Sequence, residues 1–464
     1  MATTRPEVSY EDFGSRFLRH NITNSQEKEN TNNRAYGQFN SLYLARLQQM
    51  RPLMMAVAKK RWEQSSTDLY FTEKIIDCET LEGKECVLVG TLYKEMELKP
   101  SVLDEFKELG AINVNVKPIE KYSSPNDFLL LEDESGRVRL IGLENYMGTF
   151  VTGVMVALRG IINDKGVFDV RDWTTCGERF KDLEDTAQPM ETGNEELKYV
   201  LLASDLDVCD NGSGNGLSLQ MLVDFIHGNL GAGEDRDVAK GIVRIVIAGN
   251  CIASPEAHVG RESKASVQKY QMEISRNSKK FDLYLAQMLS SCPVDVMPGE
   301  SDPVNFLLPQ QPLHPCLIPH SARFSSLGLH SNPYEVKIEN RSFMGHSGQP
   351  IKDISLQTNH ELSKSEEHLQ ILGDTLQWSH LAPSAPDTTP CYPFTDSDPF
   401  VIKTLPHVLF SGNEDVFATK LISFGNGMDT RLICVPSFKK TQEVVLLELN
   451  SLTCRTLSFK ANII

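Results

Sequence analysis

Short acidic and amide-rich segments follow four apolar runs that the sequence predicts to be β-strands. The segments are Ser204–Asp207, Gly249-Asn250, Pro298–Asp302 and Ser411–Asp415. The carboxyl ends of parallel strands meet at one edge of a sheet, where α/β proteins bind ligands. Carboxylates gathered there could hold metal ions that activate water, provided that imidazole ligands accompany them. The residues expected at this edge are Asp205, Asp207, Asn250, Glu300, Asp302, Asn413 and Asp415.

The chain that must position these residues alternates strand, loop and helix from residue 197 onward. We expect strands at Tyr199–Leu206, Ile242–Ala248 and Val294–Met297, and helices at Leu217–Leu230 and Val267–Leu289. This alternation indicates a layered α/β domain. Three β-runs near the C-terminus should add edge strands to it, at Arg431–Val435, Val444–Leu449 and Thr456–Phe459.

A second module is expected upstream, where short β-runs are broken by turn residues. Five strands with two hairpins suggest a small barrel of the oligonucleotide-binding (OB) type. A helical lead-in, Tyr43–Trp62, should form two packed helices, with Pro52 in the first turn of the second. The predicted strands are Cys86–Tyr93, Phe128–Asp133, Arg137–Leu143, Val151–Arg159 and Gly166–Val170.

The expected fold is therefore a multidomain α+β and α/β chain, an OB-fold barrel followed by a layered α/β domain. We place a flexible N-terminal segment at 1–40, the lead-in and barrel at 41–180, a linker at 181–196 and the layered domain at 197–464. Neither a signal peptide nor a run long enough to cross a membrane is apparent in the sequence. A soluble intracellular protein is expected.

Charge and cysteine usage narrow the functional classes. The 464 residues carry a formal net charge of −16, and residues 84–173 contain 11 basic against 15 acidic side chains. This field disfavours binding of nucleic acid over the whole surface. The ten cysteines show no zinc-ligand spacing, which fits reduced thiols in a nuclear or cytosolic compartment.

Four aromatic residues of the barrel are either stacking platforms for bases or core residues, and the core is favoured: Phe128, Phe150, Phe168 and Trp173.

Other motifs support weaker hypotheses. The Gly-rich run Asn211–Gly216 is interpreted as a loop tip, because it lacks the lysine of a phosphate-binding loop. Ser301 has no sequence-evident base or oxyanion element for a hydrolase triad. Three isolated histidines are expected to form ordinary hydrogen bonds rather than to bind metals, namely His314, His320 and His380.

The four strand-end segments resemble the motifs of the calcineurin-like phosphoesterase superfamily. Active members read D-x-H, G-D, G-N-H-D/E, an isolated His and G-H-x-H, whereas the corresponding segments here read DLD, GN, GESD and GNED. All of these motif histidines are missing, and Met344 stands where the isolated ligand is expected, with His346 displaced. The resemblance implies an inactive fold without cofactor or catalytic residue, although the carboxylates could bind one Mg²⁺ or Ca²⁺ weakly.

A barrel followed by a phosphoesterase-like domain without the metal-binding histidines resembles the B-subunit family of the replicative DNA polymerases, in particular the small subunits of DNA polymerase delta. The resemblance covers about Tyr36 to Phe459. The blocks that carry it include VDVMPGE (294–300), LPQQPLHPC (308–316), LAPSAPDT (381–388), CYPF (391–394) and DPF (398–400).

This resemblance implies a non-catalytic accessory subunit that acts in the nucleus, in DNA replication and repair. Its implied partners are the C-terminal metal-binding module of the polymerase catalytic subunit and a third regulatory subunit, with the sliding clamp reached indirectly and DNA contacted weakly or indirectly. Candidate interface anchors are Tyr392, Phe394 and Phe400, which could equally pack inside the domain. Two alternatives remain open: a divergent metallophosphoesterase acting on nucleic acid, and an OB module that binds single strands.

Overall fold

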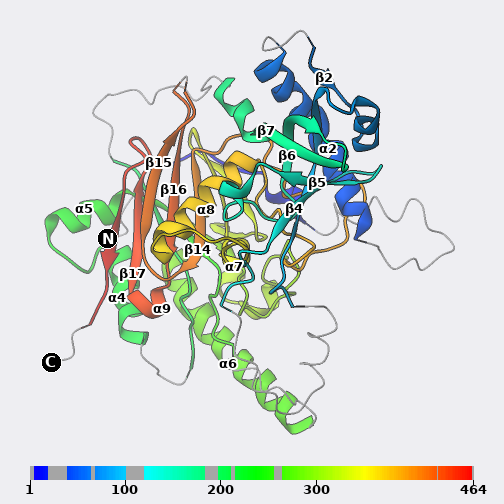
Figure 1. Ribbon diagram of the computed structural model, residues 1–464. Coiled ribbons are helices and arrows are strands. Elements are labelled where there is room, and N and C mark those ends of the chain that lie inside the picture. The colour runs from blue at the N-terminus through cyan, green and yellow to red at the C-terminus, as the bar shows by residue number, and fades with distance from the viewer. Residues whose placement is uncertain are drawn as a thin grey trace. The chain divides into compact units, whose positions relative to one another are not determined.

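The computed structural model divides into two compact units (Figure 1). The first comprises Met1–Asn24, Glu184–Gln349 and Pro406–Ile464, and the second Ser25–Leu183 and Pro350–Leu405. Residues 350–405, which we expected in the layered domain, thus group with the barrel. The structure describes residues 5–18, 39–63, 68–100, 120–182, 197–210, 215–254, 264–425 and 427–461. Most of the predicted linker and four residues of the Gly-rich loop, 211–214, lie outside the described residues.

Two six-stranded sheets build the first unit. One has the order β11-β10-β9-β8-β17-β18, and the other β1-β12-β13-β14-β16-β15. In the first sheet β8, β9 and β10 run parallel, so their carboxyl ends share an edge. The strands of the first sheet are β8 (Tyr199–Ala203), β9 (Ile242–Ala248), β10 (Val294–Met297), β11 (Leu327–Leu329), β17 (Glu443–Glu448) and β18 (Cys454–Ser458). Those of the second are β1 (Tyr10–Asp12), β12 (Tyr334–Ile338), β13 (Arg341–His346), β14 (Val408–Glu414), β15 (Ala418–Ser423) and β16 (Asp429–Pro436).

Successive residues of the central strands enter two different cores. Val200 and Leu202 of β8 pack with Phe343 and Phe410 of the second sheet. Leu201, by contrast, belongs to the core that the helices cover. A strand buried on both faces reads as a continuous apolar run, as here. The helices of this unit are α4 (Gly216–Ile226), α5 (Gly233–Gly241), α6 (Lys264–Leu289) and α9 (Phe438–Thr441).

Two expectations for the first unit were wrong. The strands β16 and β17 are interior, since β16 lies between β14 and β15, and β17 between β8 and β18. Residues 5–18 are not a flexible tail, because Tyr10–Asp12 pairs with β12 and Arg5 donates hydrogen bonds to the carbonyls of Ile226 and Ile242. The polar composition of the N-terminus conceals this pairing, which satisfies backbone groups and is accompanied by packing of Val8 and Tyr10 against the core.

The second unit contains the expected barrel. Its sheet has the order β2-β3-β4-β5-β7-β6, and an additional β3–β6 pairing closes it. All five predicted strands are present, which confirms the barrel, although β6 begins four residues later than expected. The strands are β2 (Tyr70–Phe71), β3 (Glu85–Glu95), β4 (Phe128–Glu132), β5 (Arg137–Ile141), β6 (Met155–Ile162) and β7 (Val167–Thr175). The same unit holds the helices α2 (Asn40–Trp62), α7 (Gln349–Gln357) and α8 (Lys364–Trp378).

The lead-in is one helix rather than two, because Pro52 lies inside α2. Proline removes one intrahelical hydrogen bond and is costly in a helix interior. Here Met50, Met54, Ala58 and Trp62 form a buried stripe at i, i+4 spacing that runs past the proline. Packing of this stripe against the barrel core offsets the lost hydrogen bond, a gain that a local sequence rule does not include.

No two of the ten cysteines, all within the described ranges, form a disulfide. None of the helices that the structure describes is long and apolar enough to cross a membrane.

Candidate functional site

The four strand-end segments converge in the first unit, as the sequence predicts. The backbone N–H of Asp205 donates to the carbonyl of Gly249 at 2.9 Å, and that of Asp207 to the carbonyl of Asn250 at 3.1 Å. The Asn250 side-chain oxygen accepts from the backbone of Ser301 at 3.1 Å. The second sheet joins the same edge, since the backbone of Asn413 donates to the Ser204 hydroxyl at 2.9 Å.

Four of the converging residues have a left-handed backbone. The φ angles are +53° at Asp205, +45° at Asp207, +53° at Asn250 and +59° at Asn413. Asp and Asn adopt this conformation more readily than other non-glycine residues, but it is still strained. Strain of this kind persists only where the surroundings impose it, and it gathers at functional sites. The backbone at this edge therefore has the strained geometry that is common at functional sites.

Protein groups already engage the carboxylates of this edge. Lys439 Nζ lies 2.7 Å from Asp207 Oδ2, and Lys440 Nζ lies 2.6 Å from Asp415 Oδ1. The Ser437 hydroxyl donates to Asp205 Oδ2. These three partners lie on or beside the short helix α9, and our sequence analysis missed them. The adjacent pair Lys439-Lys440, which begins three residues after the last residue of β16, is the signal that could have revealed them.

Asp302 is 4% exposed and faces inward. Its two oxygens accept from the backbone N–H groups of Ile252 and Gly299 at 2.9 and 2.8 Å. Burial raises the pKa of Asp302 to about 6, against the opposing effect of these hydrogen bonds. Asp302 therefore acts as a backbone clamp for the loop after β10. Glu300, two residues earlier, is exposed to solvent.

The displaced histidine is a core residue. His346 and Met344 are 0% and 1% exposed on β13. The Nδ1 atom of His346 accepts from the backbone of Gly348 at 3.1 Å, and burial lowers the pKa of His346 to about 3. The imidazole is therefore neutral near pH 7. Its Nε2 atom has no hydrogen-bond partner among the described residues.

A two-metal centre does not fit this set of side chains. Within the part of the chain that the structure describes, no three His, Cys, Asp or Glu side chains form a group that could hold a metal ion. The carboxylates Asp207 and Asp415 face ammonium groups instead, which compete with a cation for the same oxygens.

The remaining sequence candidates take structural positions. His314 Nδ1 accepts from the backbone of Cys316 at 3.2 Å, and His380 Nε2 lies 2.9 Å from Asp398 Oδ2. His320 is exposed. The hydroxyl of Ser301 has no hydrogen-bond partner among the described residues, and thus no base beside it.

Two of the three interface candidates are core residues of the second unit. Phe394 and Phe400 are 4% and 0% exposed, and their rings pack edge to face with centroids 5.9 Å apart. Tyr392 is half-buried at the surface. The alternative of packing inside the domain therefore applies to the two phenylalanines, and Tyr392 is the remaining candidate for an interface.

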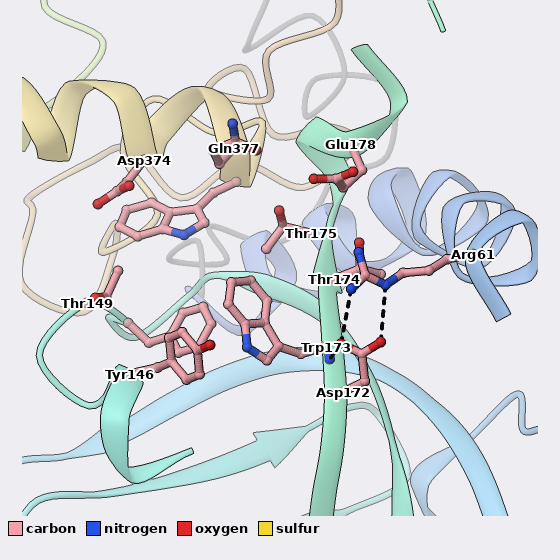
Figure 2. A pocket seen from close by; sticks show the side chains of 12 residues that line it. Arg61, Tyr146, Thr149, Asp172, Trp173, Thr174, Thr175, Glu178, Asp374 and Gln377 are labelled. Carbon is pink, nitrogen blue, oxygen red and sulfur yellow. Dashed lines mark hydrogen bonds and ion pairs between the residues drawn. The ribbon is translucent and has the colours of Figure 1, made fainter. Parts of the chain in front are cut away.

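Of the four aromatic residues considered in the barrel, two are buried in the core and two are half-buried. Phe150 and Phe168 are 1% and 0% exposed and belong to the core. Phe128 is half-buried beneath the Arg139 guanidinium, 4.5 Å from its ring centroid. Trp173 is half-buried and lines a pocket together with residues of α8 (Figure 2), a combination that distances along the sequence do not reveal.

Two family models match this chain, and one of them confirms the expected OB fold. Residues 38–173 match the DNA polymerase delta subunit OB-fold domain, and residues 200–419 match the DNA polymerase alpha/epsilon B-subunit family. An OB barrel joined to a B-subunit domain is the architecture of the accessory B subunits of replicative DNA polymerases.

Curated relatives show to which of the replicative polymerases the family belongs. The chain is 41% identical to the DNA polymerase delta small subunit of Arabidopsis thaliana, over 92% of both chains. It is 34% identical to DNA polymerase delta subunit 2 of Drosophila melanogaster, over 92% of this chain and 94% of that protein. It is 31% identical to the Saccharomyces cerevisiae DNA polymerase delta small subunit, over 91% and 90%. The chain belongs to the family of DNA polymerase delta small subunits.

Proposed function

We propose that this chain is a non-catalytic scaffold subunit of a nuclear DNA polymerase delta. It bridges the C-terminal metal-binding module of the catalytic subunit and the N-terminal domain of a further regulatory subunit, which links the enzyme to the sliding clamp in replication and repair. The observation that carries this proposal is the 41% identity to a DNA polymerase delta small subunit over 92% of both chains.

We further propose that the first unit is a phosphoesterase-like fold whose catalytic site has been lost. Two packed six-stranded sheets with converging strand ends and left-handed Asp205, Asp207 and Asn250 support this relationship. The lysine partners of Asp207 and Asp415 support the loss of activity, because an ammonium group at a former ligand position substitutes for a cation without activating water.

A scaffold needs rigid surfaces that retain their shape when partners bind. The described strands belong to two six-stranded sheets in the first unit and to one six-stranded sheet, closed by the β3–β6 pairing, in the second. Residues of the central strands of the first unit are fully buried. Tyr392 lies in a segment rich in proline, 381–394, which leaves little backbone entropy to lose on binding. We therefore assign Tyr392 to a partner interface.

Reconstitution with purified subunits tests this function. The tagged full-length chain is mixed with the polymerase delta catalytic subunit and the third subunit of the same species, and the complex is analysed by size-exclusion chromatography. One stoichiometric complex is expected. Tyr392→Ala should weaken assembly by about tenfold, in line with loss of an aromatic anchor. Tyr70→Ala is the matched control, because Tyr70 is an exposed barrel tyrosine.

A hydrolysis assay on the same preparations addresses the enzymatic alternative. The isolated chain should not hydrolyse bis-p-nitrophenyl phosphate or a 3′-tailed oligonucleotide with Mn²⁺ present. Hydrolysis that Asp205→Ala abolishes, together with failure to form the complex, would overturn the scaffold assignment.

A further inference from the structure

The side chain of Arg5, near the N-terminus, donates four hydrogen bonds to the first unit. All three nitrogens of its guanidinium take part, and every acceptor is a backbone carbonyl oxygen at a distance of 2.5 or 2.6 Å. The acceptors are the carbonyls of Ser291, Ala239, Ile242 and Ile226. Burial lowers the pKa of Arg5, but a guanidinium remains charged in proteins. A desolvated positive charge is thus held here by backbone dipoles.

These carbonyls belong to the carboxyl ends of three helices. Ile226 is the last residue of α4, Ala239 lies in the last turn of α5, and Ser291 follows the end of α6 by two residues. The carboxyl end of a helix carries partial negative charge and favours a cation. The acceptors also require a planar group with several donors, because an ammonium is a compact point charge. The three helix ends therefore form a site for a guanidinium.

The residues that follow Arg5 cover the edge of a sheet. The strand β1 pairs antiparallel with β12 over three residues. Backbone hydrogen bonds extend this pairing, from Glu339 to the carbonyl of Ser9 at 2.8 Å and from Phe13 to the carbonyl of Glu335 at 3.0 Å. Without β1, β12 would be the outer strand of its sheet. Its outward N–H and C=O groups would then be open to pairing with another strand.

Two further side chains fix the segment in register. The Tyr10 hydroxyl donates to the buried Asp295 at 3.1 Å, and the Arg244 guanidinium lies 3.6 Å from the Tyr10 ring centroid. Phe17 is 0% exposed, and its carbonyl accepts from Gln311 at 3.1 Å. Between and beside these anchors the segment is open, since residues 7, 9, 11–13 and 15 are exposed. A few specific contacts therefore hold it.

We propose that the first unit carries a binding site for an extended peptide with an arginine, and that the chain's own residues 5–18 occupy this site as a detachable latch. A terminal segment held by one short strand and a few side chains opens at a lower free energy than the sheet beneath it. Its release uncovers the guanidinium site and the β12 edge together. The contacts that hold it lie within the first unit, so the inference does not depend on the proposed scaffold role.

Hydrogen exchange of the unsubstituted full-length chain tests this proposal without any variant. The amides of Phe13 and Glu339 belong to the pairing of the latch. They should exchange at least about a hundredfold faster than the amides of β9, because the latch opens locally whereas β9 is exposed only on unfolding of the unit. Mass spectrometry of short peptides measures both rates. Equal rates would show that the segment is an integral part of the unit, and the proposal would be wrong.

Substitution of Arg5 tests the anchor. Arg5→Lys keeps the charge but loses the planar set of donors, so it should speed exchange at Phe13 and Glu339 by at least about tenfold and leave β9 unchanged. Arg455→Lys, at an exposed position of β18 in the same unit, is the matched control and should change neither. Thermal unfolding verifies that both variants are folded. Equal exchange in the two variants would overturn the proposal.

A synthetic peptide of residues 5–18 with a C-terminal fluorophore tests binding in trans by fluorescence anisotropy. It should bind the full-length Arg5→Met chain at least about tenfold more tightly than the unsubstituted chain, whose own tethered latch occupies the site. The same peptide with Arg5→Lys should bind the Arg5→Met chain at least about tenfold more weakly. No saturable binding, equal binding to both chains or equal binding of both peptides would overturn the proposal.

Discussion

Two buried residues of the first unit, His346 and Asp302, bind protons differently in the folded and unfolded chain. Burial lowers the pKa of His346 from 6.5 to about 3, so unfolding takes up a proton between these pH values. Stability is therefore lost as pH falls from 6.5 towards 3. Burial raises the pKa of Asp302 from 3.8 to about 6, and stability is lost as pH rises through this window. The two effects oppose each other near pH 5.

Replacing the histidine should separate these effects. In His346→Asn the contribution of His346 disappears. The free energy of unfolding of the unsubstituted chain, minus that of the variant, should rise by about 1.4 kcal/mol per pH unit between pH 4 and 6. Urea unfolding at pH 4, 5 and 6 measures this difference. His320→Asn, at an exposed histidine, is the control. Parallel curves for the unsubstituted chain and His346→Asn would show that the buried imidazole titrates normally.

A second residue-scale prediction concerns the buried ion pair of the second unit. Arg46 and Asp398 are both fully buried, 2.7 Å apart, and Arg46 also donates to the carbonyls of Gly153, Pro383 and Ala385. Arg46→Met leaves a buried carboxylate and three carbonyls without their charged donor. It should lower the free energy of unfolding by about 3–5 kcal/mol, measured by urea denaturation.

The matched control lies on the same helix. Lys60 pairs with Asp182, and both side chains are exposed, so Lys60→Met should cost under about 1 kcal/mol. A similar cost for both variants would mean that Arg46 contributes only as a surface residue does.

The helix α2 shows how packing overrides a local rule at the scale of elements. Pro52 lies inside it and is exposed. Pro52→Ala adds the backbone N–H that proline lacks and removes the ring from the helix interior. The variant also gains unfolded-state entropy, worth about 0.4–1 kcal/mol against folding. We expect a net stabilisation of about 1–2 kcal/mol in urea unfolding.

Lys59→Ala, at another exposed position of α2, is the control and should change stability by less than about 0.5 kcal/mol. A destabilised Pro52→Ala variant would show that the proline is required for the path of the helix.

Charge is the feature that acts at the scale of the whole molecule. The net charge is −16, and the barrel stretch 84–173 is itself acidic. We predict that the isolated chain binds a 20-nucleotide single strand with a Kd weaker than about 100 µM at 150 mM salt, since phosphate contacts supply most non-specific affinity. Fluorescence anisotropy at several salt concentrations measures this, with the reconstituted polymerase complex as positive control. Tight binding that falls steeply with salt, and that Phe128→Ala removes, would favour the single-strand-binding alternative.

Much of the fold could be predicted from the sequence because local patterns carry it. The strand Ile242–Ala248 has the predicted bounds, and all five barrel strands are present. The convergence of strand ends followed from the parallel order of β8, β9 and β10. The interior position of β16 and β17 was not predictable, because their apolar runs do not specify which strands they pair with.

The sequence by itself determined the succession of elements, the absence of histidine from the four strand-end segments and the family to which the chain belongs, since each of these is read from residue types at short spacing. Only the tertiary structure decided which groups meet. It placed Lys439 beside Asp207, buried Phe394 and Phe400, and combined Trp173 with Asp374 in one pocket. The physical reason is that these contacts join residues far apart in the chain, so the pairing of sheets and the packing of cores set them, and no local pattern records them.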